Sequence, residues 1–167
     1  YTVYFWLTDF NGANSSAVTS LTFTTVDRTP PEFIVEPTVN NVQTNSVGLT
    51  FRLNETGVVF WAVVEAGADY PKPKPGESTI LLTDDYAKLQ VSSGLNAIAS
   101  GRVNATENID GAINVTGLEP EKAYDLYYVA QDAAGNWSYT VKKITISTLD
   151  TNGPKITQHF TQFIGED

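Results

Sequence analysis

Few side chains in this sequence have the types and spacing that catalysis requires. His159 is the only histidine, cysteine is absent, and His159 is far in sequence from any Ser–Asp pair. A Ser-His-Asp triad needs a base that an acid holds in place, and a structural zinc site needs several nitrogen or thiolate ligands. No two carboxylates stand out as the converging pair that glycoside hydrolysis uses. We therefore predict that the protein is not an enzyme.

Carboxylates could instead bind calcium, which prefers oxygen ligands. The candidates cluster at an expected helix start, at a turn and at two expected junctions: Asp84-Asp85, Glu107-Asn108-Asp110, Asp27 and Asp150. No D-x-D-x-D-G loop groups them, and the same residues fit helix-start carboxylates and solvated turns. The sequence thus predicts no cofactor, with Ca²⁺ as the one metal worth considering.

Five Asn-x-Ser/Thr sequons are candidate acceptors of N-linked glycans. They begin at Asn14, Asn54, Asn104, Asn114 and Asn136, which are five of the twelve asparagines. Several fall at expected turns, where a glycan would stand in water. A β protein rich in serine and threonine also carries some sequons by chance. If glycans are present, we expect them on Asn136 or Asn14 before Asn114, which we expect to begin a strand.

The composition predicts a folded, acidic protein. Hydrophobic residues make up 41% of the 167-residue chain and charged residues only 17%, unlike a disordered segment. The net charge of −9 argues against nucleic acid as a partner, because phosphate neutralisation needs lysine and arginine. No apolar run approaches the roughly 20 residues of a membrane span, and no charged-then-apolar leader opens the chain. We expect no membrane insertion in this segment, as in a mature or trimmed fragment.

Short strands separated by turns dominate the chain. The clearest is 46–54, where Val47, Leu49, Phe51 and Leu53 alternate with polar residues. Further strands are expected at 33–43, 58–67, 111–118, 123–132 and 140–148. A short helix is expected over 83–94, with two aspartates in its first turn and Gly94 at its end. This pattern predicts an all-β, antiparallel sandwich.

The first 33 residues repeat near the end of the chain. Residues 1–33 align without a gap with residues 124–156, at a constant offset of 123 positions. Ten positions are identical: Tyr1/Tyr124, Tyr4/Tyr127, Asp9/Asp132, Gly12/Gly135, Ser15/Ser138, Val18/Val141, Thr22/Thr145, Thr25/Thr148, Asp27/Asp150 and Pro31/Pro154. Because both copies also have the pattern of strand, turn and strand, we interpret the match as a true internal repeat.

The repeat predicts a chain that is out of phase with its units. Residues 1–28 would be the closing hairpin of a preceding repeat, 29–149 a complete domain, and 150–167 the opening segment of the next repeat. In the alternative, both ends are ordinary hairpins of one large sandwich. The alternative requires the first hairpin to be buried within a self-contained sandwich.

The stretch GLEPEKAYDLYYVAQDAAGNWS, residues 117–138, resembles the closing half of a fibronectin type III domain. Its Leu118-x-Pro120-x-x-x-Tyr124 pattern resembles the tyrosine corner, in which the tyrosine hydroxyl bonds back to the chain just upstream. DRTPPEF, residues 27–33, resembles a junction between tandem copies in secreted surface proteins. GVVFWAVVEAGADYPKPKPGES, residues 57–78, resembles the third strand and short helical insert of a subgroup in tandem arrays of microbial and algal surface proteins.

The resemblance implies an immunoglobulin-like, fibronectin type III-like sandwich with an insert at about 66–103. It also implies an extracellular, cell-surface location and a structural repeat that serves as spacer, coat or filament building block. Two alternatives remain: an adhesion module that binds surface glycans or proteins, with Tyr70, Trp137 and Tyr139 as candidate exposed rings, and an accessory domain of a secreted hydrolase.

The first hairpin has an apolar face and no sheet of its own. That face would carry Tyr1, Val3, Phe5 and Leu7. Since an isolated two-stranded hairpin is marginally stable in water, we expect it either to pack on the complete unit or to meet a neighbouring copy by strand addition. The apolar anchors of the matching opening segment would be Ile156, Phe160, Phe163 and Ile164. Such head-to-tail contacts between copies do not close and build a filament.

Overall fold

The structure is a computed structural model that describes residues 1–14, 17–71, 84–151 and 153. Within this part, nine strands and one helix follow one another along the chain. They are β1 (Thr2–Phe5), β2 (Thr19–Thr22), β3 (Phe33–Val42), β4 (Ser46–Leu53), β5 (Gly57–Glu65), α1 (Asp84–Ser93), β6 (Ala99–Ala105), β7 (Asp110–Thr116), β8 (Ala123–Asp132) and β9 (Lys142–Ser147).

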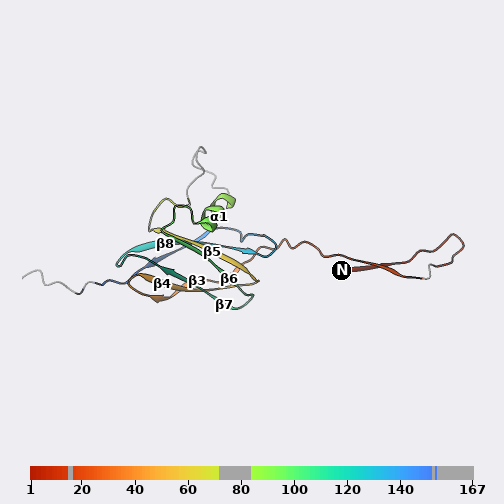
Figure 1. Cartoon of the computed structure of the whole chain (residues 1–167), viewed down its shortest axis with the longest axis horizontal. Helices are drawn as coiled ribbons and strands as arrows, with labels where there is room; N and C mark the ends of the chain where they lie inside the picture. Colours follow the sequence, from red (N-terminus) through yellow and green to blue (C-terminus); the bar gives the residue numbers. More distant parts are fainter. Residues whose placement is uncertain (15–16, 72–83, 152, 154–167) are drawn as a thin grey trace, which may run out of the picture.

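Strands β3 to β9 form a sandwich of two antiparallel sheets. One sheet has the order β3-β4-β7 and the other has the order β6-β5-β8-β9. The remaining two strands, β1 and β2, form a separate hairpin that extends away from the sandwich (Figure 1). The chain enters the sandwich at the end nearest this hairpin and leaves it at the opposite end (Figure 1). The predicted all-β, antiparallel sandwich is therefore confirmed.

The core lies between the two sheets. Alternate residues of β4 point into it, and Val47, Leu49, Phe51 and Leu53 are almost completely buried, as their period of two predicts. Residues of β8 meet them from the opposite sheet and belong to the same cluster. Phe33, at the start of β3, packs edge-on against Tyr128 with 5.2 Å between the ring centroids. This contact joins the first strand of the sandwich to its closing hairpin.

The helix creates a second, smaller core on the outer face of the four-stranded sheet. Val91 of α1 and Val129 of β8 belong to a buried cluster there, together with Tyr70. The Tyr70 hydroxyl donates a hydrogen bond of 3.0 Å to the carbonyl oxygen of Gln90 in α1. Strands β5 and β8 are consequently buried on both faces, as the apolar sequence of β5 indicates. No helix in the described part is long and apolar enough to span a membrane.

Two details of the middle region differ from the sequence-based expectation. The predicted insert at about 66–103 includes most of β6, a strand that we did not predict because its sequence ASGRVNA has little β-branched or aromatic character. Gly101 of β6 lies against Trp61, and a Cβ atom there would come within 2.5 Å of the ring. Asn114 is the fifth residue of β7 and does not begin a strand.

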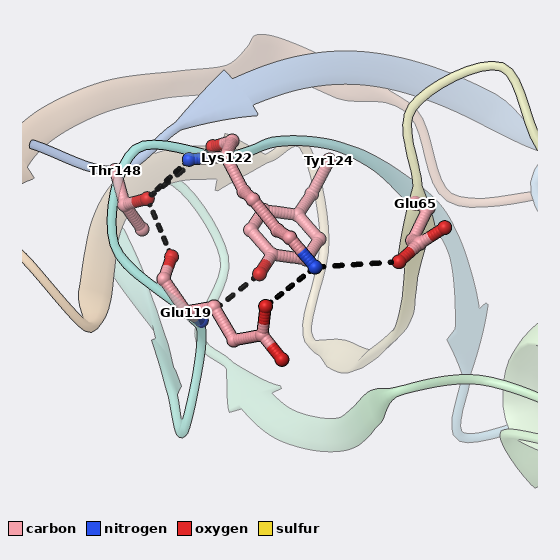
Figure 2. A network of polar contacts seen from close by, with 5 residues as sticks. All are labelled: Glu65, Glu119, Lys122, Tyr124 and Thr148. Atoms are coloured by element: carbon pink, nitrogen blue, oxygen red, sulfur yellow. Dashed lines mark hydrogen bonds and ion pairs between the residues drawn. The ribbon is translucent and has the colours of Figure 1, made fainter.

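The tyrosine corner is present at the start of β8. The Tyr124 hydroxyl accepts a hydrogen bond of 2.9 Å from the backbone N–H of Glu119 (Figure 2). Leu118 is buried in the same core cluster as Tyr124. Thr148, just after β9, closes the same loop because its hydroxyl donates to the Glu119 carbonyl over 2.7 Å and accepts from the Lys122 N–H over 3.1 Å. Pro120 is exposed at the tip. The corner therefore connects the β7–β8 loop to the end of β9.

Tyr124 makes two separable contributions to stability. We expect Tyr124→Phe to lower the free energy of unfolding by about 1–3 kcal/mol, because it leaves the partly buried N–H of Glu119 without its acceptor. Tyr124→Ala should cost about 3–5 kcal/mol, because it also empties the site of a buried ring. Urea denaturation of both variants measures the difference. Small and equal losses would contradict a role for the hydroxyl.

Candidate functional site

The β1–β2 hairpin exposes an unusual amount of apolar surface. Every described residue from 1 to 29 is exposed. The side chains predicted for inter-repeat contact are open to solvent: Tyr1 (79% exposed), Val3 (48%), Phe5 (46%) and Leu7 (75%). On the opposite face, Tyr4 and Trp6 are also exposed. The expectation that this hairpin packs on the complete unit therefore does not hold. The residues proposed to contact its apolar side chains, Ile156, Phe160, Phe163 and Ile164, lie outside the described residues.

The hairpin reproduces the backbone pairing of β8 and β9. All four of its pairs, from Thr2↔Thr22 to Phe5↔Thr19, recur 123 residues later as Asp125↔Thr145 to Tyr128↔Lys142. An isolated bridge beyond each hairpin matches at the same offset, Thr8↔Asn14 against Gln131↔Trp137. Because a one-residue slip would move every side chain to the other face, the shared register gives each residue of β1 a defined counterpart in β8.

The turns of the two hairpins also match. Asp9 and Asp132 each accept a hydrogen bond of 2.8 Å at the carboxylate, from the N–H of Ala13 and of Asn136 respectively. A glycine three residues after each aspartate has a positive φ, 85° for Gly12 and 93° for Gly135, which side-chain-bearing residues rarely adopt. The match between residues 1–23 and 124–146 is thus one of geometry as well as sequence.

In the complete unit, every exposed feature of β1 has a covered counterpart. The free edge of β1 corresponds to the edge of β8 that pairs with β5, from Gly57↔Asp132 to Glu65↔Tyr124. Its inner face corresponds to side chains of β8 in the main core, and its outer face corresponds to side chains beneath α1. Among the described residues, the hairpin therefore has the form of β8 and β9, with one edge of β1 unpaired and its faces exposed.

The segment after the hairpin is fixed to the sandwich by specific bonds. The Asn136 side chain donates to the Asp27 carbonyl oxygen over 3.2 Å, and the backbone N–H of Glu32 donates to Asn54 Oδ1 over 2.8 Å. Pro31 between these points is buried. The junction is consequently held by two turns of the domain that follows it.

Three carboxylates meet at this junction. Asp27 of the connecting segment, Glu55 of the β4–β5 turn and Asp132 at the end of β8 each place an oxygen within 4.8 Å of the others. One oxygen of Glu55, Oε1, is buried and has no hydrogen-bond partner among the described residues. Of the three residues, the sequence singled out only Asp27, because nothing in the linear sequence brings the others to it. Such a trio could hold a hard divalent cation, and Ca²⁺ binding stays a prediction.

The electrostatics of Glu55 and Asp132 differ. Burial, followed by the negative charges of Asp132, Asp27 and Glu107, raises the pKa of Glu55. Burial also acts to raise the pKa of Asp132, but hydrogen bonds from the side chain and backbone of Asn136 and from neighbouring backbone N–H groups lower it below its ordinary value. The trio thus combines a carboxyl group whose pKa is lowered with one whose pKa is raised.

The other candidate calcium ligands do not join this trio. Asp110 forms an ion pair of 2.8 Å with Arg52. Among the described residues, neither Glu107 nor Asp150 belongs to a three-ligand group. The side chains of Asp84 and Asp85, and the whole of His159, lie outside the described part of the structure.

The aromatic residues considered for glycan binding are mostly covered. Tyr70 is buried beneath α1 and packs edge-on against Tyr127, and burial raises its pKa to about 12. Trp137 is half-buried against Phe60, with 5.5 Å between the ring centroids. Tyr139 is exposed. Two of the three rings are therefore structural.

The five sequons differ in how their side chains are engaged. Asn14, Asn104 and Asn114 are exposed, whereas Asn54 and Asn136 are half-buried. The Asn136 Nδ2 atom, to which a glycan would be attached, donates to Asp132 over 2.7 Å as well as to Asp27. A glycan would replace one of its two hydrogens, so the expectation that Asn136 is modified before Asn114 is not favoured by the geometry.

No protein family model matches this chain, and no curated protein matches it. A computationally redesigned β-sandwich protein is similar in structure, with a TM-score of 0.40 and 17% identity over 74% of this chain and 98% of its own. The sensor domain of the anti-sigma factor RsgI4 of Pseudobacteroides cellulosolvens also has a TM-score of 0.40, with 11% identity over 74% of this chain and 99% of its own. The likeness concerns the β-sandwich fold alone.

The raised pKa of Glu55 predicts a pH-dependent effect of Glu55→Gln. A carboxyl group whose pKa is raised by folding favours the folded state below its unfolded pKa of about 4.3, and this contribution is lost as pH rises through the folded value. At pH 7 we therefore expect Glu55→Gln to raise the melting temperature by roughly 2–4 °C, with no gain at pH 4.

Glu121→Gln is the matched control, because Glu121 is exposed at the opposite end of the sandwich. It should change little at either pH. A lower melting temperature of Glu55→Gln at pH 7 would contradict the prediction. Repeating the melts with millimolar Ca²⁺ tests the calcium prediction. If the trio binds Ca²⁺, the ion should raise the melting temperature of the wild type but not that of Glu55→Gln.

Glycosylation can be mapped by mass spectrometry of peptides from the native material. We expect hexosamine on Asn14, Asn104 or Asn114 before Asn54 or Asn136, because the first three side chains are exposed and the last two are half-buried at the junction. A glycan on Asn136 with Asn104 and Asn114 unmodified would reverse this order. Unmodified asparagine at all five positions would remove the glycoprotein prediction.

Proposed function

We propose that the chain is a structural repeat module of an extracellular or cell-surface protein, which acts as a spacer, coat or filament building block through head-to-tail domain contacts. In this proposal residues 29–149 are one fibronectin type III-like domain, and the segments before and after it belong to neighbouring repeats. The module has no catalytic role, and its work is to set a fixed distance and direction between its two ends.

The observation that carries the proposal is the shared register of the two hairpins. Residues 1–23 repeat the strand pairs, the bridge and the turn of residues 124–146 at one constant offset. A hairpin of this form belongs to a sandwich, and its apolar faces are exposed in this chain. A second sandwich joined to the first would cover them.

The connecting segments support a head-to-tail arrangement. The chain enters and leaves the sandwich at opposite ends, so successive units would lie in line (Figure 1). At the entrance, Asn136 and Asn54 hold the connecting segment on either side of buried Pro31. At the exit, the Leu149 N–H donates to the Gln43 carbonyl over 3.0 Å. Ends that are fixed in this way favour a spacer of defined direction over a flexible tether.

The extracellular location rests on the sequons and on the resemblance to secreted surface proteins. The adhesion alternative, in which the domain binds surface glycans or proteins, would use exposed rings. Tyr70 is buried and Trp137 is half-buried, so Tyr139 is the one exposed ring among the three candidates for this binding. The accessory-domain alternative places a hydrolase elsewhere in the polypeptide.

Mass spectrometry of the native polypeptide tests the array. We expect an intact mass well above the 18.2 kDa of this chain, and peptides that extend beyond Tyr1. By equivalence with Tyr124, the residues six and four positions before Tyr1 should be leucine and proline, as Leu118 and Pro120 are. A native polypeptide without a second sandwich sequence would contradict the proposal. A hydrolase sequence in the same polypeptide would support the accessory-domain alternative.

A further inference from the structure

The hairpin differs from β8 in size at two positions that are tightly enclosed in the complete unit. At the common offset, Trp6 corresponds to Val129 and Leu7 corresponds to Ala130. Val129 and Ala130 are each 0% exposed, whereas Trp6 and Leu7 are 61% and 75% exposed in the hairpin. The covering structure of the hairpin must therefore accommodate two much larger side chains than β8 presents.

The neighbours of Val129 and Ala130 leave no room for these side chains. Val129 lies directly opposite Phe60 of β5, in the small cluster beneath α1. Ala130 lies opposite Val59, which is completely buried in the main core. Inserting larger groups into a packed interior forces neighbouring side chains and backbone to shift. An identical copy of the complete unit would therefore not fit over Trp6 and Leu7 of the hairpin.

A polar position distinguishes the two strands as well. Asp125 is buried and accepts hydrogen bonds from the Gly67 N–H over 3.0 Å and from Thr145 over 2.7 Å. Its counterpart in the hairpin is Thr2, whose hydroxyl lies 3.1 Å from that of Thr22. The structure covering Thr2 consequently needs no turn that donates to a carboxylate, as the turn at Gly67 does.

We propose that the β1–β2 hairpin is completed by a β5-like strand of a non-identical sandwich repeat, with side chains smaller than Phe60 and Val59 opposite Trp6 and Leu7. This proposal rests on the repeat array proposed above and specifies the partner. The strand would pair antiparallel with residues 1–9, in the register that joins β5 to residues 124–132. The other sheet and the helical layer of that repeat would cover the two faces of the hairpin.

A hybrid chain tests both parts of the proposal. Residues 124–150 of the full chain are replaced by a second copy of residues 1–27, which has the same length. In the relieved form of the hybrid, the second copy also carries Trp6→Val and Leu7→Ala. We expect the relieved hybrid to unfold cooperatively, and the unrelieved hybrid to melt about 5–15 °C lower, because it is overpacked.

Substitution of the opposing strand provides the matched comparison. Phe60→Ala with Val59→Ala should lower the melting temperature of the relieved hybrid, because it empties space in the core. In the unrelieved hybrid the same pair should raise it, since Trp6 and Leu7 then gain room. Unrelieved and relieved hybrids of equal stability would overturn the requirement for a non-identical partner.

Two further measurements test the proposal without the hybrids. If the relieved hybrid does not fold, the parent chain with Val129→Trp and Ala130→Leu is melted with and without Phe60→Ala and Val59→Ala. No rescue there would overturn the proposed complementarity, whereas rescue supports it. Light scattering and hydrogen exchange of the wild-type chain give an independent result. A discrete homo-oligomer with protected residues 1–7 would show that an identical copy covers the hairpin, and would overturn the proposal.

These experiments distinguish an error in the proposed partner from an error in the proposed repeat array. If the native polypeptide holds tandem sandwiches but the stability pattern above is not found, only the nature of the partner is wrong. If the pattern is found and the native polypeptide holds a single sandwich, the array is wrong and the complementary strand belongs to another chain.

Discussion

Strand β8 is hydrogen-bonded along both edges and buried on both faces, and the rest of the sandwich is arranged around that condition. β5 and β9 satisfy its backbone groups, the three-stranded sheet covers its inner face, and α1 with Tyr70 covers its outer face. Since exposed backbone edges and apolar faces are costly and invite association, such a strand is stable only in a complete domain. β1 has the same apolar pattern, but within the described part of the chain only one of its edges is paired and its faces are exposed. Its stability therefore depends on what covers it.

The turn after β8 also holds the segment through which the chain enters the sandwich. Asp132 organises the turn, and Asn136 in the same turn reaches the connecting segment at Asp27. The position of the incoming chain is therefore determined by the hairpin that closes the domain. Thr148 performs a comparable task at the other end, where it joins the tyrosine corner to the end of β9. Both ends of the domain thus depend on the β8–β9 hairpin.

Much of the fold could be predicted because short-range patterns specify it. The alternation in β4, the doubly apolar β5, the short helix and the repeated hairpin are visible in local sequence, and the tyrosine corner has its own spacing. β6 was missed because its residues have weak strand preference and its place depends on pairing with β5. The carboxylate trio and the burial of Tyr70 were missed for a related reason, since each depends on contacts between segments that are distant in sequence.

The positions of the two ends also determine how the domain would carry a pulling load. The chain enters at the start of β3 and leaves at the end of β9, and these two strands lie at sheet edges and run in the same direction through the sandwich (Figure 1). Each is bonded along its length to one neighbour, β4 or β8. Tension between the ends would act along these strands, so that many backbone hydrogen bonds resist sliding together. Peeling them apart singly would require force across the sheet, which this geometry does not supply.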